Sequence, residues 1–243
     1  MIPKKIHYCW FGGKPLPALA EKCILSWKKH CPDYEIVRWD EDSFDLQQHP
    51  YTAEAYKAGK YAFITDYVRL WALFIHGGIY MDTDVEVIKS LDCFLHHRAF
   101  SGFENKYCVQ TGIMGSEING EWVKQELACY DNKHFILPDG TPDLTPNTKT
   151  ITEHLTEDGF LLNNCYQEHK NIVVMYPHDY FCPKSWKTGK IELTENSYTI
   201  HHFDGSWLPK HHRAAIYLYR LFTKIVGEKV STRLVNLIRT GKQ

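Results

Sequence analysis

Residues 60–88, KYAFITDYVRLWALFIHGGIYMDTDVEVI, constrain the fold of this chain more strongly than any other stretch. Between residues 61 and 75 the side chains are apolar almost all round a helical repeat, a pattern typical of a helix inside a core. Gly77 and Gly78 end this helix, because glycine readily adopts the left-handed conformation found just past a helix terminus. The apolar run at 79–81 is too short for another helix and predicts a buried strand. The stretch therefore predicts a helix and a strand that both belong to the core.

Two aspartates, Asp82 and Asp84, follow this strand with one residue between them. They stand at the carboxyl end of a strand, where α/β folds place their ligand sites. The negative charges of these aspartates would be costly to bury among apolar residues unless a positive charge compensates them, as a divalent cation would. Mn²⁺ and Mg²⁺ take carboxylate oxygens together with substrate phosphates. The alternative is a turn in which both aspartates cap the strand end, but the helix, glycines and strand before them favour the metal site.

Three other places carry side chains suited to a ligand. Asp66 and Arg69 are the only charged residues of the buried helix, and their spacing of three puts them on one face. Trp10 ends the first predicted strand, where its ring could stack on a flat base or simply fill the core. His201 and His202 follow a short predicted strand, and neighbouring strand residues face opposite sides, so only one of them is expected in a site. The alternative for these histidines is a hairpin with a hydrogen-bonded core imidazole.

The order of elements predicts an α/β fold. A strand at 6–10, an amphipathic helix at 16–30 and a strand at 34–39 form a β-α-β unit, which begins a mostly parallel sheet. The 243 residues suffice for one large domain of this class. Further elements are predicted as follows: helices at 51–58, 121–130 and 150–155, strands at 99–103, 109–115 and 172–176, and a long loop at 131–148 that could border an acceptor site.

Composition excludes several classes of function. The net charge of −1 gives no argument for nucleic-acid binding. Eight cysteines are scattered without a C-x-x-C pair, so neither a zinc cage nor a redox motif is expected. Together with an N-terminus that lacks a long apolar region, they suggest reduced thiols in the cytoplasm. No run approaches the roughly 18 apolar residues that a membrane-spanning helix needs.

The C-terminal region, 209–243, is predicted to form basic amphipathic helices that follow a domain at 1–208. Its polar side carries eight Lys or Arg residues against the single acid Glu228. Such helices either lie on an anionic membrane surface or pack on the domain with their cations in water. A peripheral position on the inner face of the cell membrane is therefore one expectation.

Three stretches together resemble a known family: IPKKIHYCWFGG, FITDYVRLWALFIHGGIYMDTDVEVI and HHFDGSW. They are similar to the DXD-motif glycosyltransferases of family 32, which include bacterial capsular and lipopolysaccharide transferases and fungal Golgi mannosyltransferases. The glucosyltransferase domains of the large clostridial toxins are more distant relatives. The resemblance covers residues 2–88 well, resumes at 201–207 and is weak between them. It implies a GT-A fold, a Rossmann-like nucleotide-sugar-binding α/β architecture with a mostly parallel central sheet, here with a C-terminal helical extension.

The resemblance also implies an activity. The donor would be a nucleotide-diphosphate sugar, with a UDP-sugar favoured and GDP-mannose as the alternative, and the cofactor Mn²⁺ or Mg²⁺. The acceptor would be a hydroxyl of a glycan or lipid-linked glycan in polysaccharide, capsule or lipopolysaccharide synthesis. Family members of this kind retain the anomeric configuration. Since no nucleophile is evident in the sequence, we expect the acceptor hydroxyl to attack on the front face with help from the departing phosphate.

Site residues follow from the same resemblance. Asp84 would bind the metal directly, and Asp82 would contact metal, ribose or sugar. Asp66 and Arg69 would hold donor-sugar hydroxyls and phosphate. These four are the expected catalytic residues, and His202 is the expected C-terminal metal or phosphate contact.

The remaining contacts would come from Trp10, stacked on the base, and from Ser206 and Trp207, closing over the diphosphate.

Two other classes of protein compete with the glycosyltransferase. A haloacid-dehalogenase-type phosphohydrolase matches its D-x-D-x-[TV] motif at 82–85, but an extended run follows the motif here, and no later Gly-Asp-x-x-x-Asp is present. A non-catalytic sugar-binding module is the other alternative, although it has no need of the charged pair on the buried helix.

Overall fold

The chain opens with the predicted strand–helix–strand unit, in a computed structural model that describes residues 1–205, 208, 210–227 and 230–231. Strand β1 (Lys5–Cys9), helix α1 (Ala18–His30) and strand β2 (Glu35–Trp39) follow one another, and β1 pairs with β2 in parallel. The buried residues of α1 are Ala20, Cys23 and Trp27, whose spacing puts one stripe of the helix on the sheet.

The central sheet has eight strands, in the order β2-β1-β3-β7-β5-β9-β8, with β6 beside β5. Its other strands are β3 (Gly78–Met81), β5 (Ala99–Asn105), β6 (Cys108–Val109), β7 (Ile113–Ser116), β8 (Gln167–His169) and β9 (Val173–Tyr176). Strands β2, β1, β3, β5 and β9 run in one direction, and β6, β7 and β8 run against them. The prediction of an α/β fold with a mostly parallel sheet is therefore confirmed.

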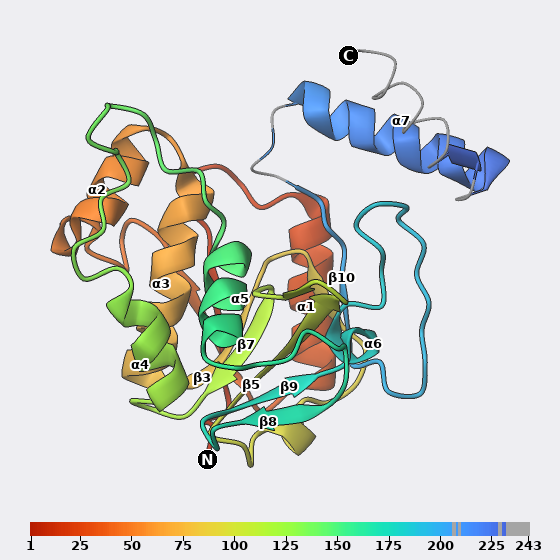
Figure 1. Cartoon of the computed structure of the whole chain (residues 1–243), viewed down its shortest axis with the longest axis horizontal. Helices are drawn as coiled ribbons and strands as arrows, with labels where there is room; N and C mark the ends of the chain where they lie inside the picture. The colour runs from red at the N-terminus through yellow and green to blue at the C-terminus, as the bar shows by residue number, and fades with distance from the viewer. Residues whose placement is uncertain (206–207, 209, 228–229, 232–243) are drawn as a thin grey trace.

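Helices cover both faces of this sheet (Figure 1). One hydrophobic core joins it to α2 (Pro50–Lys57), α3 (Tyr61–His76), α4 (Glu121–Ala128) and α5 (Asn147–Glu157). A second core joins the other face to α1, the short helix α6 (His178–Phe181) and the 3₁₀ turn Asp92–Phe94. Another 3₁₀ turn, Leu46–Gln48, precedes α2. Neighbouring residues of β3 alternate between the two cores, with Ile79 in one and Tyr80 in the other, as the pleat of a strand requires.

The stretch at 60–88 has the structure that its pattern predicts. Helix α3 runs from Tyr61 to His76, and β3 is buried at every position between β1 and β7. Gly77 and Gly78 have φ of +60° and +105°, a region that other residues rarely adopt. A Cβ on Gly78 would also lie 2.8 Å from the carbonyl oxygen of Lys5, so glycine is needed there for space as well.

The predicted strand at 109–115 is wrong in part, because the structure divides it into β6 and β7. The side chain of Gln110 causes the break by binding the backbone of a residue three positions later. Its Oε1 accepts a hydrogen bond from the N–H of Ile113 at 2.8 Å, and its Nε2 donates to the carbonyl of Ile113 at 2.5 Å. Strand β8 and helix α6 were also not expected from the sequence pattern.

Helix α7 (Lys210–Val226) begins where the C-terminal helical region was predicted and stands to one side of the sheet (Figure 1). Arg213 pairs with Asp204 at 3.0 Å, and Arg220 donates to the carbonyl of Trp186 at 2.7 Å, so the helix is held to the domain by polar contacts. The predicted helix beyond Gly227 lies almost wholly outside the described residues. Among the helices that are described, none has the length and apolar character needed to cross a membrane.

Candidate active site

A small antiparallel sheet brings the candidate metal ligands together. Strand β4 (Val85–Val87) continues from the two aspartates, and β10 (Thr199–His201) pairs with it so that His201 lies opposite Val85. The His201 Nε2 atom is 3.3 Å from Oδ1 of Asp84 and 3.9 Å from Oδ2 of Asp82. One ligand atom from each of the three residues lies within 4.8 Å of the others. The cluster therefore has the size of a single-cation site.

The donor set fits a divalent cation. Two carboxylates and one imidazole are ligand types that divalent cations take in proteins. Burial opposes ionisation of Asp84, but the charge and hydrogen bond of His201 and the N–H of Asp204, 2.8 Å from Oδ2, lower its pKa to about 2. Burial likewise opposes protonation of His201, yet Asp84 raises the pKa of the imidazole well above its usual value. The carboxylates thus favour positive charge at this position.

The structure does not bring His202, the expected metal contact, to the aspartates. Its Nε2 lies 2.8 Å from Oε2 of Glu86, which also pairs with Lys22 at 2.8 Å. Adjacent strand residues point to opposite faces, so the entry of His201 into the site excludes its neighbour. Of the two histidines, the structure therefore places His201, and not the expected His202, beside Asp82 and Asp84.

Asp66 and Arg69 reach the motif from α3, as the sequence predicts. Arg69 Nη2 lies 2.9 Å from Oδ1 of Asp66 and 3.5 Å from Oδ1 of Asp82, while Nη1 donates to the carbonyl of Thr111 at 2.7 Å. The hydroxyl of Tyr80 donates to the same Asp82 oxygen at 2.7 Å. Asp82 is therefore fixed by two donors from the core before any ligand binds.

Asp66 is held from a second helix. The backbone N–H of Asn147, at the start of α5, lies 3.4 Å from its Oδ2, and the Asn147 side chain donates to the Asp66 carbonyl at 3.1 Å. Burial raises the pKa of Asp66 to about 6, against the opposing charge of Arg69. With side chains only 13% and 6% exposed, the acid and the arginine are placed to orient Asp82 as well as to meet a ligand.

Comparison with known proteins agrees with this geometry. Residues 17–101, which include both aspartates and the pair on α3, match the family described as a glycosyltransferase sugar-binding region containing a DXD motif. Inositol phosphoceramide mannosyltransferase 3 of Schizosaccharomyces pombe is 32% identical over 122 residues, which are 47% of this chain and 33% of that protein. Residues 17–101 thus resemble the sugar-binding region of the DXD-motif glycosyltransferases.

A second curated protein and two solved structures are also similar to the chain. Mannosyl phosphorylinositol ceramide synthase CSH1 of Saccharomyces cerevisiae is 30% identical over 129 residues, 48% of this chain and 32% of that protein. The chain thus spans about a third of the length of the curated relatives that it matches. The PaToxG glycosyltransferase has a TM-score of 0.48 at 19% identity, covering 65% of this chain and 70% of its own. A glycosyltransferase involved in glycosylation of the major capsid of PBCV-1 has a TM-score of 0.49 at 11% identity, covering 87% and 98%.

Trp10 and the loop after β10 complete the family residues. Trp10 directly follows β1, the parallel neighbour of β3, so it stands at the same edge of the sheet as Asp82. Its ring is partly buried, and its Nε1 donates to the carbonyl of Lys14 at 2.6 Å. Ser206 and Trp207, expected to close over the diphosphate, lie outside the described residues.

Two further residues shape the metal cluster. A Cβ on Gly112 would lie 2.8 Å from the His201 ring and 3.3 Å from Oδ2 of Asp82. The imidazole of His201 therefore occupies the space that a side chain at Gly112 would need. Glu104 on β5 is a third carboxyl group near this cluster. Burial raises its pKa, the charge of His201 opposes that shift, and the charge of Asp82 adds to it. Nothing in the local sequence marks Glu104, because only the pairing of β5 places it there.

A cleft of about 570 Å³ opens beside the cluster, between α7 and the turn after β10. Asp204, whose N–H binds Asp84, forms part of its wall, so the cleft adjoins the metal site. Three cations line it: Lys184, Arg213 and Arg220. Burial lowers the pKa of Lys184, which donates to the carbonyl of His202 at 2.8 Å. Such a lining suits an anionic ligand, and sequence analysis did not single out Lys184.

Proposed function

We propose that this chain is a GT-A-type glycosyltransferase that holds Mn²⁺ with Asp82, Asp84 and His201 and moves a sugar from a nucleotide-diphosphate donor to a hydroxyl acceptor. The observation that carries the proposal is the three-residue cluster at the end of β3, inside the stretch that matches the DXD family. Bound there, the cation would neutralise negative charge that develops on the departing diphosphate.

The residues of the chain have separate tasks in this proposal. Arg69 and Tyr80 hold one oxygen of Asp82, which leaves its other oxygen directed to the cluster. Asp66 keeps Arg69 in place. Trp10 stacks on the base of the donor, and Ser206 and Trp207 close over its phosphates. The acceptor hydroxyl attacks the anomeric carbon on the face that the phosphate leaves, and the phosphate oxygen takes the hydroxyl proton, so that configuration is retained.

Mannose is the donor sugar that we favour. The sequence alone favoured a UDP-sugar with GDP-mannose as the alternative, but both curated relatives are named as mannosyl-transferring enzymes. Their names also contain inositol phosphoceramide or phosphorylinositol ceramide, in which a phosphate joins a polyol to a lipid. The cleft cations Lys184, Arg213 and Arg220 would bind such a phosphate, placing a headgroup hydroxyl beside the metal cluster.

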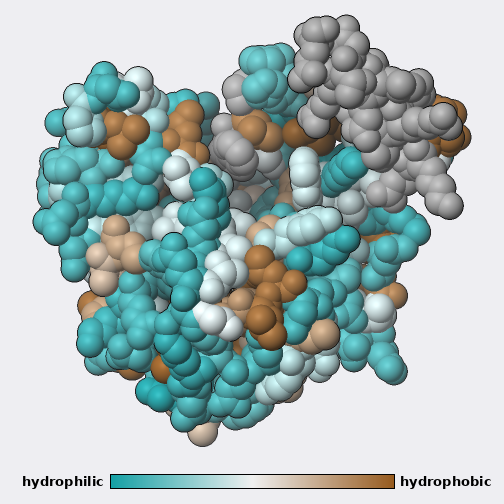
Figure 2. Space-filling model, in the orientation of Figure 1, coloured by the Kyte–Doolittle hydropathy of each residue, from teal (hydrophilic) through white to brown (hydrophobic). Residues whose placement is uncertain are grey.

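Helix α7 supports an acceptor carried on a lipid. Figure 2 shows hydrophobic surface on this helix, whereas most of the same face of the molecule is hydrophilic. Its exposed large apolar residues include Tyr217, Leu218, Leu221, Phe222 and Ile225. Because this helix also lines the cleft, peripheral contact with an anionic membrane would bring the acceptor headgroup to the site.

A donor assay tests the proposal. The protein is incubated with GDP-mannose or with UDP-sugars, with Mn²⁺ or with a chelator, and release of free sugar is measured without acceptor. Slow metal-dependent release from one nucleotide sugar, accelerated by a phosphoinositol-containing acceptor, is expected. Hydrolysis of simple phosphate esters instead would support the phosphohydrolase, against which the structure shows strand β4 after the motif in place of a helix. No binding or turnover of any nucleotide sugar would leave only the sugar-binding module.

A further inference from the structure

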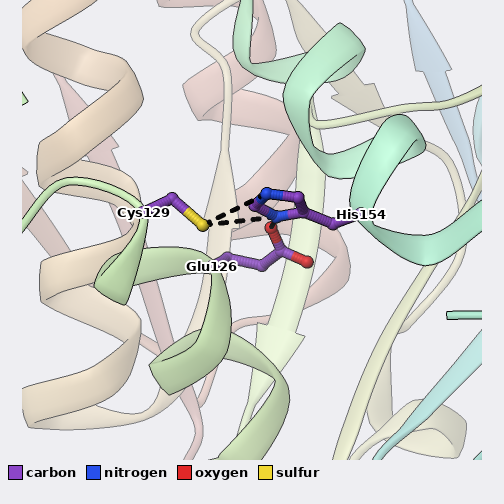
Figure 3. A group of neighbouring side chains, drawn as sticks. All are labelled: Glu126, Cys129 and His154. Atoms are coloured by element: carbon purple, nitrogen blue, oxygen red, sulfur yellow. Dashed lines mark hydrogen bonds and ion pairs between the residues drawn. The ribbon is translucent and has the colours of Figure 1, made fainter. Parts of the chain in front are cut away.

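A second group of metal-ligating side chains lies between α4 and α5, apart from the active site (Figure 3). Glu126 belongs to the last turn of α4, Cys129 caps that helix, and His154 faces both from α5. Oε2 of Glu126 lies 3.0 Å from Nδ1 of His154, and Sγ of Cys129 lies 3.3 Å from the same nitrogen. One ligand atom from each residue lies within 4.8 Å of the other two.

The separations are close to those of a zinc site. Carboxylate oxygen, thiolate sulfur and imidazole nitrogen are the three ligand types that Zn²⁺ uses in proteins. Tetrahedral bonds of usual length would put nitrogen and sulfur about 3.6 Å apart, and nitrogen and oxygen about 3.4 Å apart. The observed 3.3 and 3.0 Å are a few tenths of an ångström shorter, and because Sγ also lies 3.4 Å from Nε2, the imidazole would have to turn to direct its Nδ1 lone pair at the metal. Glu126 and Cys129 are three residues apart at the end of α4, so their side chains lie on the same face of that helix.

Burial gives the cluster a reason to hold a cation. Glu126 is 4% exposed, and a carboxylate in such surroundings is costly unless it is paired or bound to a metal. The His154 side chain remains 37% exposed, so water can reach the cluster and supply a fourth ligand.

We propose that Glu126, Cys129 and His154 bind Zn²⁺ and thereby join α4 to α5. The helix that would be fixed in this way begins at Asn147, which holds the backbone and carboxylate of Asp66. The site would therefore support the active site from a distance through α5. It does not depend on the chain being a glycosyltransferase, because the metal would serve structure rather than chemistry.

Cobalt substitution tests this site directly, because a thiolate bound to Co²⁺ gives a charge-transfer absorption band. The full chain is stripped with a chelator and titrated with Co²⁺ in excess Mg²⁺, which occupies the site at Asp82 and Asp84. One equivalent of thiolate-bound Co²⁺ is expected, displaced by Zn²⁺. The band should be lost in Cys129→Ser, and affinity should fall at least about tenfold in His154→Gln.

Two controls separate this site from other thiols. Cys165→Ser removes an exposed cysteine and should keep the band. Asp84→Asn should also keep the band. This control is needed because Cys182 is a thiol close enough to His201, in the proposed active-site cluster, to raise the pKa of the imidazole. Thermal unfolding gives a second readout: Zn²⁺ should raise the melting temperature of Asp84→Asn, but not of the double variant Asp84→Asn/Cys129→Ser. Absence of the band in the wild-type protein, or a band that survives Cys129→Ser, would overturn the proposal.

Discussion

Arg69 and Asp82 are joined across 3.5 Å, from the buried helix α3 to the first aspartate of the motif. The same guanidinium binds Asp66 and the carbonyl of Thr111, so its planar fork serves three acceptors at once. The buried helix α3 therefore also orients the strand end that carries Asp82.

Replacing Arg69 with lysine should separate charge from geometry. A single ammonium cannot reach Asp66, Asp82 and the Thr111 carbonyl together, so Asp82 would lose its fixed orientation. We expect the affinity for Mn²⁺ to fall about 10–100-fold in Arg69→Lys, as for other groups that orient metal ligands. Metal titration monitored by the melting temperature measures this. The matched control is Arg98→Lys, an exposed pair with Glu117, which should leave the affinity unchanged.

The two adjacent histidines give the sharpest test of the metal cluster. His201→Gln removes an imidazole next to Asp84, whereas His202→Gln removes one that binds Glu86. The first change should weaken Mn²⁺ binding at least about tenfold, and the second should have little effect on it. Isothermal titration of both variants provides the comparison. Equal losses in the two, or a larger loss for His202→Gln, would refute the assignment of His201.

This pair also shows what the sequence could and could not predict. Local sequence patterns predict the helix within 60–88, the glycines that end it and the strand before Asp82. The buried positions of these elements agree with those patterns. The choice between His201 and His202 depends on the register of β10 on β4, and a shift of one residue reverses which side chain faces the site. That register is fixed by contacts more than a hundred residues apart in the chain, which no local pattern records.

The broken strand and the proposed zinc cluster have the same physical origin, since both depend on contacts that no local pattern records. The strand at 109–115 is broken by the side chain of Gln110 folding back on Ile113, although its residues have a strand pattern. The expectation of no zinc cage rested on the absence of C-x-x-C. The cluster at Glu126, Cys129 and His154 takes its ligands from two helices and three residue types, and only the packing of α4 against α5 brings them together.

Gly112 should not tolerate a side chain. The Cβ of Gly112→Ala would press on the His201 ring at 2.8 Å, and such overpacking costs about 1–3 kcal/mol. If the clash is with this ring, the cost of Gly112→Ala should shrink in a His201→Ala background, with a coupling of about 0.5–3 kcal/mol in the double-mutant cycle. Urea unfolding of the four proteins measures it. Strictly additive losses would show that Gly112 is needed for another reason.

Membrane contact through α7 can be tested with vesicles. Leu218 and Leu221 are 62% and 45% exposed and share one face of the helix. Replacing both with glutamate should lower binding to anionic vesicles at least about tenfold, since burying each leucine contributes about 1.5–3 kcal/mol. The control is Tyr107→Glu, which puts a glutamate at an exposed residue outside α7 and should bind vesicles as the wild type does. Equal flotation of all three proteins with anionic vesicles would exclude α7 as the contact.

The buried imidazole of His7 predicts how stability depends on pH. Its Nε2 donates to the carbonyl of Gly77 at 2.8 Å, and its Nδ1 accepts from the indole N–H of Trp39 at 3.2 Å. Only the neutral ring can make both bonds, because a protonated Nδ1 would face another N–H.

Burial lowers the pKa of His7 from 6.5 to about 4, with the Gly77 carbonyl opposing the shift. The folded state therefore binds fewer protons than the unfolded state between these two values, and stability falls as the pH drops through this window. Between pH 7 and pH 5 the contribution of His7 should decrease by about 2 kcal/mol. Other histidines titrate as well, so the difference between the wild type and His7→Gln isolates this ring. Chemical denaturation at several pH values should show a steeper decline for the wild type, and NMR should find its His7 still neutral at pH 5. If the stabilities of the wild type and of His7→Gln fall in parallel with pH, and His7 protonates near pH 6.5, the hydrogen-bonded neutral tautomer is contradicted.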